Sequence, residues 1–258
     1  EAPPPTPPPV TAATPGGMRL HAMQTGWVQV KSRHRTLAGP AALRLPGILL
    51  DGAWTPWLPI LCYAIEHPEG VLVVDTGETA RAMDPAYFAC SRGDAFFYGR
   101  NLRFALRGED EIGPQLRRLG IEPERVRWVA MTHLHSDHTG GVPQLTRSRF
   151  LLSRGDAAGH LGTLGCRIPD GLLREAVAHD GPPVGAFAAS HAVTRDGAVL
   201  LVPTPGHSPA HQSVLLRDGE LSWLFAGDAA FDLGQVERGE VAGIVADVPA
   251  ARETVARL

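Results

Sequence analysis

The sequence predicts an α/β fold in which two mixed β-sheets carry helices on their outer sides. Alternating apolar residues indicate strands from Met18 onwards, and helical patterns lie both between and after the groups of strands. This order is typical of stacked sheets with helices outside them. With 258 residues, of which 44% are hydrophobic, the chain is long enough for one such domain with a substantial core.

Residues 1–17 differ in composition from the rest of the chain. The stretch EAPPPTPPPVTAATPGG is rich in proline and contains no core residue beyond Val10. We expect an extended, disordered tail with polyproline II character. It would serve as a plain linker or, alternatively, as a ligand for a proline-binding partner. The folded domain is predicted to run from residue 18 to residue 258.

The first half of the domain is predicted to consist mainly of strands. MRLHAMQTGWVQV (18–30) reads as a strand, and LPILCYAIEHPEGVLVVDTG (58–77) as a hairpin that turns at its Pro-Glu-Gly sequence. GEDEIGPQLRRLG (108–120) is predicted to be a helix because Ile112, Leu116 and Leu119 share one face and a glycine follows. Its proline is tolerable only in the first turn.

Further strands are predicted downstream. VRWVAM (126–131) is a short apolar strand that leads directly into THLHSDHTGG (132–141). AVTRDGAVLLVPT and SVLLRDGELSWLFAGD each place Asp-Gly between apolar runs, a strong hairpin signal. Residues 249–258 are predicted to form a helix with one buried stripe. Residues 155–190 are rich in Gly and Ala, and we assign no element there.

Composition argues against several classes of partner. The net charge of −3 provides no broad basic surface for nucleic acid, and no apolar run approaches the roughly 20 residues of a membrane-spanning helix. We therefore expect neither nucleic acid nor membrane as a partner, and we leave a homodimer open. Cys62, Cys90 and Cys166 are odd in number and lack a CxxC pair, so we expect small buried thiols rather than disulfides. The protein is expected to be soluble, with a cytoplasmic location slightly favoured over secretion.

THLHSDHTGG places three histidines and an aspartate within six positions after a strand. Alternate residues of a tight loop can point the same way, so His133 and His135 can bind one ion. Asp137 and His138 then point to a neighbouring position. Imidazole and carboxylate ligands suit zinc, and two adjacent ions suit a hydrolase that holds hydroxide between them.

Further ligands are expected where other strands end. TPGHSPAHQS supplies His207 in a loop bounded by Gly and Pro, and LFAGDAAF supplies Asp228 after an apolar strand. Site residues are commonly mounted at such positions of a rigid scaffold. The sequence therefore predicts that His207 and Asp228 join the histidine cluster.

These motifs, in this order and spacing, resemble the metallo-β-lactamase superfamily. The resemblance runs from Met18 to the end and implies an αββα sandwich with a dinuclear metal centre. LPILCYAIEHPEGVLVVDTG, EDEIGPQLRRLGIEPERVRWVAMTHLHSDHTGG and TPGHSPAHQS are most similar to the N-acyl-homoserine lactonase group.

The resemblance implies roles for particular residues. One zinc ion would be bound by His133, His135 and His207, and a second by Asp137, His138 and Asp228, with Asp228 bridging the two. Asp75 would accept a hydrogen bond from a metal-bound histidine, and His211 would be structural or support a ligand. The other histidines are expected to be exposed or singly hydrogen-bonded: His21, His34, His67, His160, His179 and His191.

The chain departs from the family pattern at two points. The superfamily has a further histidine near the C-terminus of the domain, but no histidine follows His211 here. We expect a domain truncated at its C-terminus, with the second zinc site incomplete. Homoserine lactonases also carry a tyrosine three residues after the bridging aspartate, where this chain has Phe231. Phenylalanine lacks the hydroxyl donor, so oxyanion stabilisation would depend more on the metal.

An aromatic segment bears on the substrate. Six aromatic residues lie between positions 87 and 104. They are either an ordinary packed segment or subunit interface, or an apolar flap over the metals that suits an acyl chain. The substrate-pocket candidates are Phe96, Phe97, Phe104 and Phe231.

The expected function is a zinc-dependent hydrolase that opens an N-acyl-homoserine lactone or similar ester by attack of a metal-bridging hydroxide. Asp137 is the expected catalytic residue, because it can position the nucleophile and carry a proton to the leaving oxygen. The alternatives are a glyoxalase II-like thioesterase, a class B3-like β-lactamase, or an inactive metal-binding scaffold.

Overall fold

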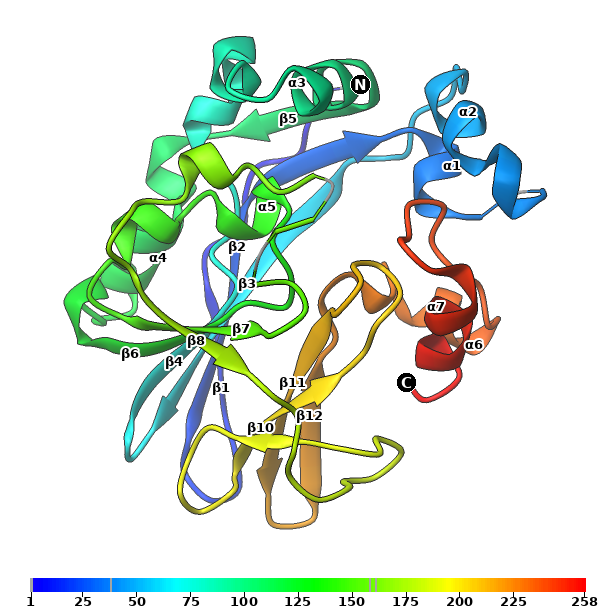
Figure 1. Ribbon diagram of the computed structural model, residues 1–258. Coiled ribbons are helices and arrows are strands. Elements are labelled where there is room, and N and C mark those ends of the chain that lie inside the picture. The colour runs from blue at the N-terminus through cyan, green and yellow to red at the C-terminus, as the bar shows by residue number, and fades with distance from the viewer. Residues whose placement is uncertain (1, 38, 158, 161) are drawn as a thin grey trace.

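The structure is a computed structural model that describes residues 2–37, 39–157, 159–160 and 162–258. Two β-sheets pack face to face, and helices lie on their outer sides (Figure 1). The strands are β1 (Val10–Ala13), β2 (Arg19–Val30), β3 (Leu58–His67), β4 (Gly70–Val74), β5 (Leu102–Leu106), β6 (Val126–Ala130), β7 (Arg149–Ser153), β8 (Leu173–Val177), β9 (His191–Ala192), β10 (Val199–Pro203), β11 (Gln212–Asp218) and β12 (Leu221–Phe225). The helices are α1 (Ser32–Arg35), α2 (Arg44–Leu49), α3 (Arg92–Asn101), α4 (Ile112–Arg118), α5 (Ser136–Thr139), α6 (Leu233–Glu237) and α7 (Val248–Val255).

The larger sheet is mixed and has eight strands. Seven follow the order β1-β2-β3-β4-β6-β7-β8, and β5 pairs with the second half of β2. The pairs from β1 to β4 are antiparallel, whereas β4, β6, β7 and β8 run parallel. The smaller sheet, β12-β11-β10-β9, is antiparallel throughout. The α/β sandwich is confirmed, but only one of its two sheets is mixed.

Apolar cores hold the layers together. Leu72, Trp128 and Leu151 of the larger sheet pack against Leu201 and Val214 of the smaller one. On the other face of the larger sheet, Val73 and Phe150 pack against Ile112 and Leu116 of α4. The outer face of the smaller sheet packs against Leu258, just beyond α7. These cores establish the helix–sheet–sheet–helix order, which is visible from left to right in Figure 1.

Most of the predicted elements are present. The β3–β4 hairpin turns at Pro68 and Glu69, and β11 and β12 form the second Asp-Gly hairpin. The helix predicted over 108–120 is shorter, because a 3₁₀ turn at Gly108–Asp110 precedes α4. Pro114 lies in the first turn of α4. Residues 155–190, which had no assignment, contain β8. No helix among the described residues has the length and apolar character needed to cross a bilayer.

Two expectations are corrected. Part of the predicted tail is a strand, because residues 10–13 pair with the first four residues of β2 and thereby cover that part of its edge. Cys90 and Cys166 form a disulfide across 76 positions, and both lie at the surface. Their distance in sequence hid this pairing. Cys62 is a buried free thiol, as predicted.

Candidate metal centre

Strand ends bring the predicted ligands to one edge of the sandwich. Because β4 and β6 are parallel neighbours, Asp75 and the loop 132–141 emerge side by side. The smaller sheet contributes His207 after β10 and Asp228 after β12. Four segments that are far apart in the sequence therefore meet at one place, and the predicted ligands lie on them.

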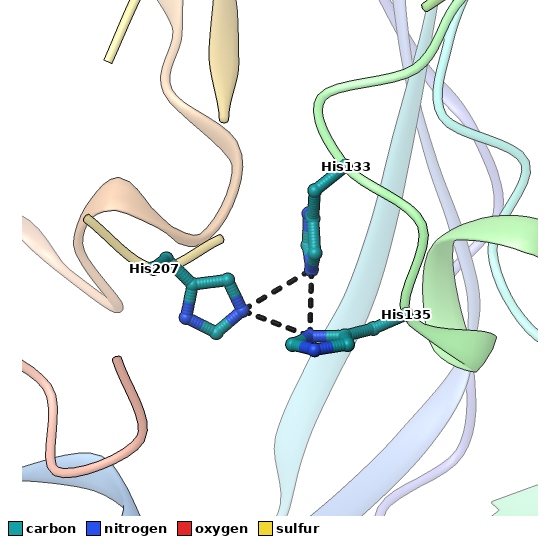
Figure 2. A group of neighbouring side chains, drawn as sticks. All are labelled: His133, His135 and His207. Carbon is teal, nitrogen blue, oxygen red and sulfur yellow. Dashed lines mark hydrogen bonds between the residues drawn. The ribbon is translucent and has the colours of Figure 1, made fainter. Parts of the chain in front are cut away.

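Three histidines converge as predicted. His133 Nε2 lies 2.9 Å from His135 Nδ1 and 3.2 Å from His207 Nε2, and the His135 and His207 atoms are 2.9 Å apart (Figure 2). A tetrahedral zinc ion with Zn–N bonds of about 2.0–2.1 Å holds its nitrogen ligands about 3.3 Å apart. The three nitrogen atoms are therefore spaced to bind one such ion.

A second group of potential ligands lies beside the first. Asp228 places Oδ1 3.2 Å from His138 Nε2 and Oδ2 3.4 Å from His207 Nε2. One carboxylate thus spans both positions, as a bridging ligand would. His133, His138 and Asp228 form the second compact group of donor atoms. Asp137 stands at its rim, with Oδ2 3.9 Å from His138 Nε2.

Hydrogen bonds on the far side of each ring fix which nitrogen faces the centre. His207 Nδ1 donates to the carbonyl of Ile244 at 3.0 Å, and His138 Nδ1 donates to Asp75 at 2.8 Å. The hydroxyl of Thr132 donates to Asp75, so it can accept from His133 Nδ1 at 3.1 Å. Each of these rings therefore presents an unprotonated Nε2 in its neutral form. This donor set fits metal ions, and Asp75 accepts a hydrogen bond from one of these histidines.

The segment that contains Asp75 also grips the backbone of the metal loop. Thr76 donates two hydrogen bonds to the carbonyl of His138, at 2.9 Å from its N–H and 2.7 Å from its hydroxyl. The N–H of Gly140 donates to Gly77 O at 2.8 Å. Glu78 is fully buried against Gly140, and its Oε1 accepts from the N–H of Thr79. The loop is therefore held at its backbone as well as at its side chains.

Two glycines permit the closest approaches around the site. A Cβ on Gly206 would lie 2.4 Å from Ala251 Cα, so α7 packs directly on the loop that carries His207. Gly227 has a φ of 55°, and a Cβ there would lie 2.8 Å from the side chain of Thr132. Any larger residue would push His207 or Asp228 away from the centre.

Burial and neighbouring charges shift the pKa values of the cluster. Burial, followed by the surrounding imidazoles, lowers the pKa of His133 well below its usual value. Burial alone would also lower the pKa of His138, but Asp75, Asp228 and Asp137 together raise it well above normal. Burial raises the pKa of Asp137. For Asp228, His138 and His207 overcome the effect of burial and lower the pKa. Without metal the cluster thus holds neutral rings beside one charged pair.

Several histidines, some near the site and some away from it, were misjudged from the sequence. The side chain of His160 is 7% exposed and its ring centroid lies 5.0 Å from that of His135, whereas an exposed or singly hydrogen-bonded ring was expected. His34 is also buried, and its backbone carbonyl accepts from the N–H groups of Gly243 and Ile244. His21 and His67 are buried with two partners each. These positions depend on chain crossings that local spacing does not encode.

His211 has the structural place expected of it. It is fully buried, its Nδ1 lies 2.9 Å from Thr204 Oγ1, and its Nε2 has no hydrogen-bond partner among the described residues. Burial lowers its pKa to about 3. The His211 ring centroid lies 5.2 Å from that of His133. His211 therefore lies beside His133, on the buried side of the site.

A third group of potential ligands, His67, Glu69 and Asp196, is held together by hydrogen bonds instead. His67 Nδ1 accepts from the N–H of Glu69, so its Nε2 carries the proton that it donates to Asp196 at 2.9 Å. Both ring nitrogens are therefore in use. This contact ties the β3–β4 turn to the β9–β10 turn, and so joins the two sheets at the edge opposite the metal centre.

Most of the aromatic segment is packed core. Tyr87, Phe88 and Tyr98 are buried together with Leu164, and Phe104 packs against them. The Cys90–Cys166 disulfide and a hydrogen bond from Tyr98 Oη to Gly162 O tie the segment to the loop 159–168. These contacts agree with the packed alternative rather than with a mobile flap.

The predicted substrate-pocket residues lie apart from one another. Phe96 is exposed on α3, whereas the Phe97 ring centroid lies 6.1 Å from that of His34. Phe231 packs with Leu37 against the cluster around α7. A cavity of about 90 Å³ lies behind the metal loop, lined by residues such as Leu134, and the four candidate phenylalanines are not among its lining residues.

A two-sheet α/β sandwich with converging histidines and a spanning aspartate defines a class of metal-binding proteins. The chain belongs to the metallo-β-lactamase superfamily, whose family model matches residues 55–257. The resemblance inferred from the motifs is therefore confirmed at the level of the family.

Curated relatives include N-acyl homoserine lactonases. The enzyme of Bacillus sp is 31% identical over 174 residues, which are 67% of this chain and 61% of the relative. AttM of Agrobacterium fabrum is 27% identical over 209 residues, which are 78% of this chain and 76% of AttM. The chain thus spans about three fifths of the length of the first relative.

Solved structures share the fold. A structure of Bacillus thuringiensis AiiA with N-decanoyl-L-homoserine at its active site matches with a TM-score of 0.73 and 24% identity. The match covers 92% of this chain and 86% of AiiA. At this identity, the likeness shows the fold.

Proposed function

We propose that the protein is a zinc-dependent hydrolase that opens N-acyl-homoserine lactones or similar esters. The observation that carries the proposal is the pairing of two donor groups through Asp228, whose two oxygens face His138 and His207 separately. Such a pair suits two neighbouring ions. The sequence relatives named as lactonases support the choice of substrate.

Each of the two donor groups would hold one ion. His133, His135 and His207 would hold the first ion, and His138 and Asp228 the second, with Asp137 at its rim. When bound, two zinc ions supply Lewis acidity and activate water at neutral pH. Asp75 and Ile244 keep His138 and His207 turned toward them by accepting hydrogen bonds from Nδ1.

Asp137 is the candidate for proton transfer. Its carboxylate stands beside His138 at the rim of the second group, and burial raises its pKa toward the range useful in catalysis. In this role Asp137 takes up a proton as the nucleophile forms and gives it to the oxygen that leaves the ring. Phe231 offers no hydrogen-bond donor, so the chain supplies no phenolic hydroxyl at that position.

A turnover assay on the purified chain tests the proposal. With added zinc, the protein is expected to open acyl-homoserine lactones of several chain lengths, and a chelator is expected to abolish the activity. Asp228→Asn should lower both zinc content and kcat, the latter by at least about 100-fold. His191→Ala is the control, because His191 lies in β9 and belongs to neither of the two donor groups. Cleavage of nitrocefin or a glutathione thioester without lactone turnover would contradict the proposal.

A further inference from the structure

Exposed apolar side chains gather on two helices that contact each other. Leu43, Leu45 and Leu50 are 62%, 39% and 80% exposed at the ends and on the surface of α2, and Phe96 of α3 is 62% exposed. Arg100 of α3 donates to the carbonyl of Leu49 at 2.9 Å, which joins the two helices. Figure 1 shows both helices at the upper end of the molecule. Single exposed leucines are ordinary, but a group of them marks an interaction surface.

Arginines without acidic partners accompany these side chains. Residues 31–53 contain four basic residues and one acidic residue, and residues 91–107 contain the same numbers, although the whole chain has a net charge of −3. Within the described residues, Arg33, Arg92 and Arg100 form no ion pair, and all three are exposed. The guanidinium of Arg33 lies over Gly47 of α2.

The two acidic residues of these segments form no ion pair with an arginine side chain among the described residues. Asp51 accepts from the N–H groups of Arg33 and Ala53, and Asp94 accepts from the hydroxyl of Ser91. We define the α2–α3 patch as Leu43, Leu45, Leu50, Phe96, Arg33, Arg92 and Arg100. It combines an apolar surface with three arginine side chains that form no ion pair among the described residues, although Asp51 lies near Arg33.

We propose that the α2–α3 patch docks the protein on an anionic lipid surface. Leucine and phenylalanine side chains can enter the boundary between headgroups and acyl chains, while the arginines meet the anionic headgroups. A second copy of the chain fits less well, because a two-fold interface would bring the same unpaired arginines face to face. Such a contact needs no membrane-spanning helix, and none is found in the part of the chain that the structure describes.

The patch lies close to the metal centre. The ring of His34, next to Arg33, packs near Phe97, and the backbone carbonyl of His34 accepts from the N–H of Ile244. The carbonyl of Ile244 in turn holds the ligand His207. A protein docked through the patch therefore carries its metal centre beside the lipid surface, where substrates with acyl chains concentrate. Lipid binding itself does not depend on the proposed hydrolysis.

Vesicle sedimentation tests the docking. The full chain is expected to sediment with vesicles that contain about one third phosphatidylglycerol, at least tenfold more than with phosphatidylcholine alone, and to be released by high salt. Leu50→Asp should reduce binding at least tenfold, whereas Leu221→Asp should not, because that 51% exposed leucine lies in β12, in the other sheet. Replacing Arg33 and Arg100 with Gln should cost about fivefold each, and Arg195→Gln should cost little.

Other outcomes overturn the proposal. Equal binding to neutral and anionic vesicles, or equal binding by the Leu50→Asp variant and the unaltered chain, removes the role of the patch. A dimer in sedimentation velocity that Leu50→Asp dissociates would identify the patch as a subunit interface instead. Lactone turnover in solution, measured on the same variants, separates a failure of docking from a failure of the proposed hydrolysis.

Discussion

Asp75 accepts a hydrogen bond from His138 Nδ1 at 2.8 Å and two more from the N–H and hydroxyl of Thr132. One buried carboxylate thereby orients His138 directly and His133 through Thr132. Asp75 itself has a φ of 55°, a conformation that aspartate tolerates better than most residues. The Asp75 side chain therefore helps to orient one histidine directly and another through Thr132.

The first prediction concerns this support. Asp75→Asn keeps the shape and the left-handed backbone but loses the charge that holds His138. We expect zinc affinity to fall about 10- to 100-fold. Competition with a chromophoric chelator measures the loss. Asp51→Asn, which alters a surface carboxylate bonded to backbone N–H groups, should leave affinity unchanged. Unchanged zinc affinity in Asp75→Asn would show that Asp75 does not support the ligands.

The second prediction uses the buried carboxyl of Glu78. Burial raises its pKa to about 8, so the folded state retains a proton that the unfolded chain loses near pH 4.5. Stability should therefore fall as the pH rises through this window. In chelator-treated protein, Glu78→Gln should increase the free energy of unfolding by about 1–3 kcal/mol at pH 8 and by little at pH 5.

Urea unfolding at both pH values measures this difference. Glu109→Gln, an exposed position, serves as the control and should show no dependence on pH. A Glu78→Gln effect of equal size at the two pH values would contradict the assigned protonation of the buried carboxyl.

The third prediction concerns buried histidines in the metal-free protein. Burial lowers the pKa of His34 to about 3 and also lowers that of His133. The unfolded chain binds these protons near pH 6.5, whereas the folded state does not, so stability should decline as the pH falls below 6.5. His138, whose pKa is raised, is protonated in both states below pH 6.5, so its stabilising contribution is already complete there and adds no slope.

Each such histidine contributes a slope of up to about 1.4 kcal/mol per pH unit. His34→Gln should therefore reduce the acid slope of the chelator-treated protein by about one proton, as read from urea unfolding between about pH 6.5 and pH 4. His191→Gln, which changes a partly exposed ring, is the matched control. An acid slope that His34→Gln leaves unchanged would rule out the neutral buried ring.

The fourth prediction concerns the Cys90–Cys166 disulfide. It closes a loop of 76 positions, so its loss should lower the free energy of unfolding by up to about 4 kcal/mol. A dithiol reductant should destabilise the protein, and the Cys90→Ser/Cys166→Ser double variant should be destabilised similarly and not respond to reductant. Cys62→Ser removes the free thiol and should keep the response to reductant. A response that persists in the double variant would assign it to Cys62.

The metal loop was predictable because its signal is local. His133, His135 and His138 follow one apolar strand within six positions, and their chemistry is evident from spacing alone. His207 and Asp228 could be added because strand ends are readable from apolar runs. The bridging geometry of Asp228 came from family resemblance, and the facing oxygens agree with it.

Contacts between distant segments could not be read from the sequence. His160 lies near His135 because the loop after β7 folds back over the metal loop, and Cys90 meets Cys166 for a similar reason. The strand β1 was missed because proline-rich flanks concealed a four-residue pairing with β2. In each case, the structure depends on a tertiary contact, which local sequence propensity does not predict.

The packing of Ala251 on Gly206 orders events during synthesis. During synthesis, His133 and His135 leave the ribosome first. The loop that carries His207 can be held in place only later, when Ile244 and α7 have also been made and contact it. Because a chain emerges from its N-terminus onward, a nascent protein should pass through a stage with two imidazoles aligned and the third untethered. Metal capture by all three imidazoles would then have to wait until α7 docks on the loop of His207.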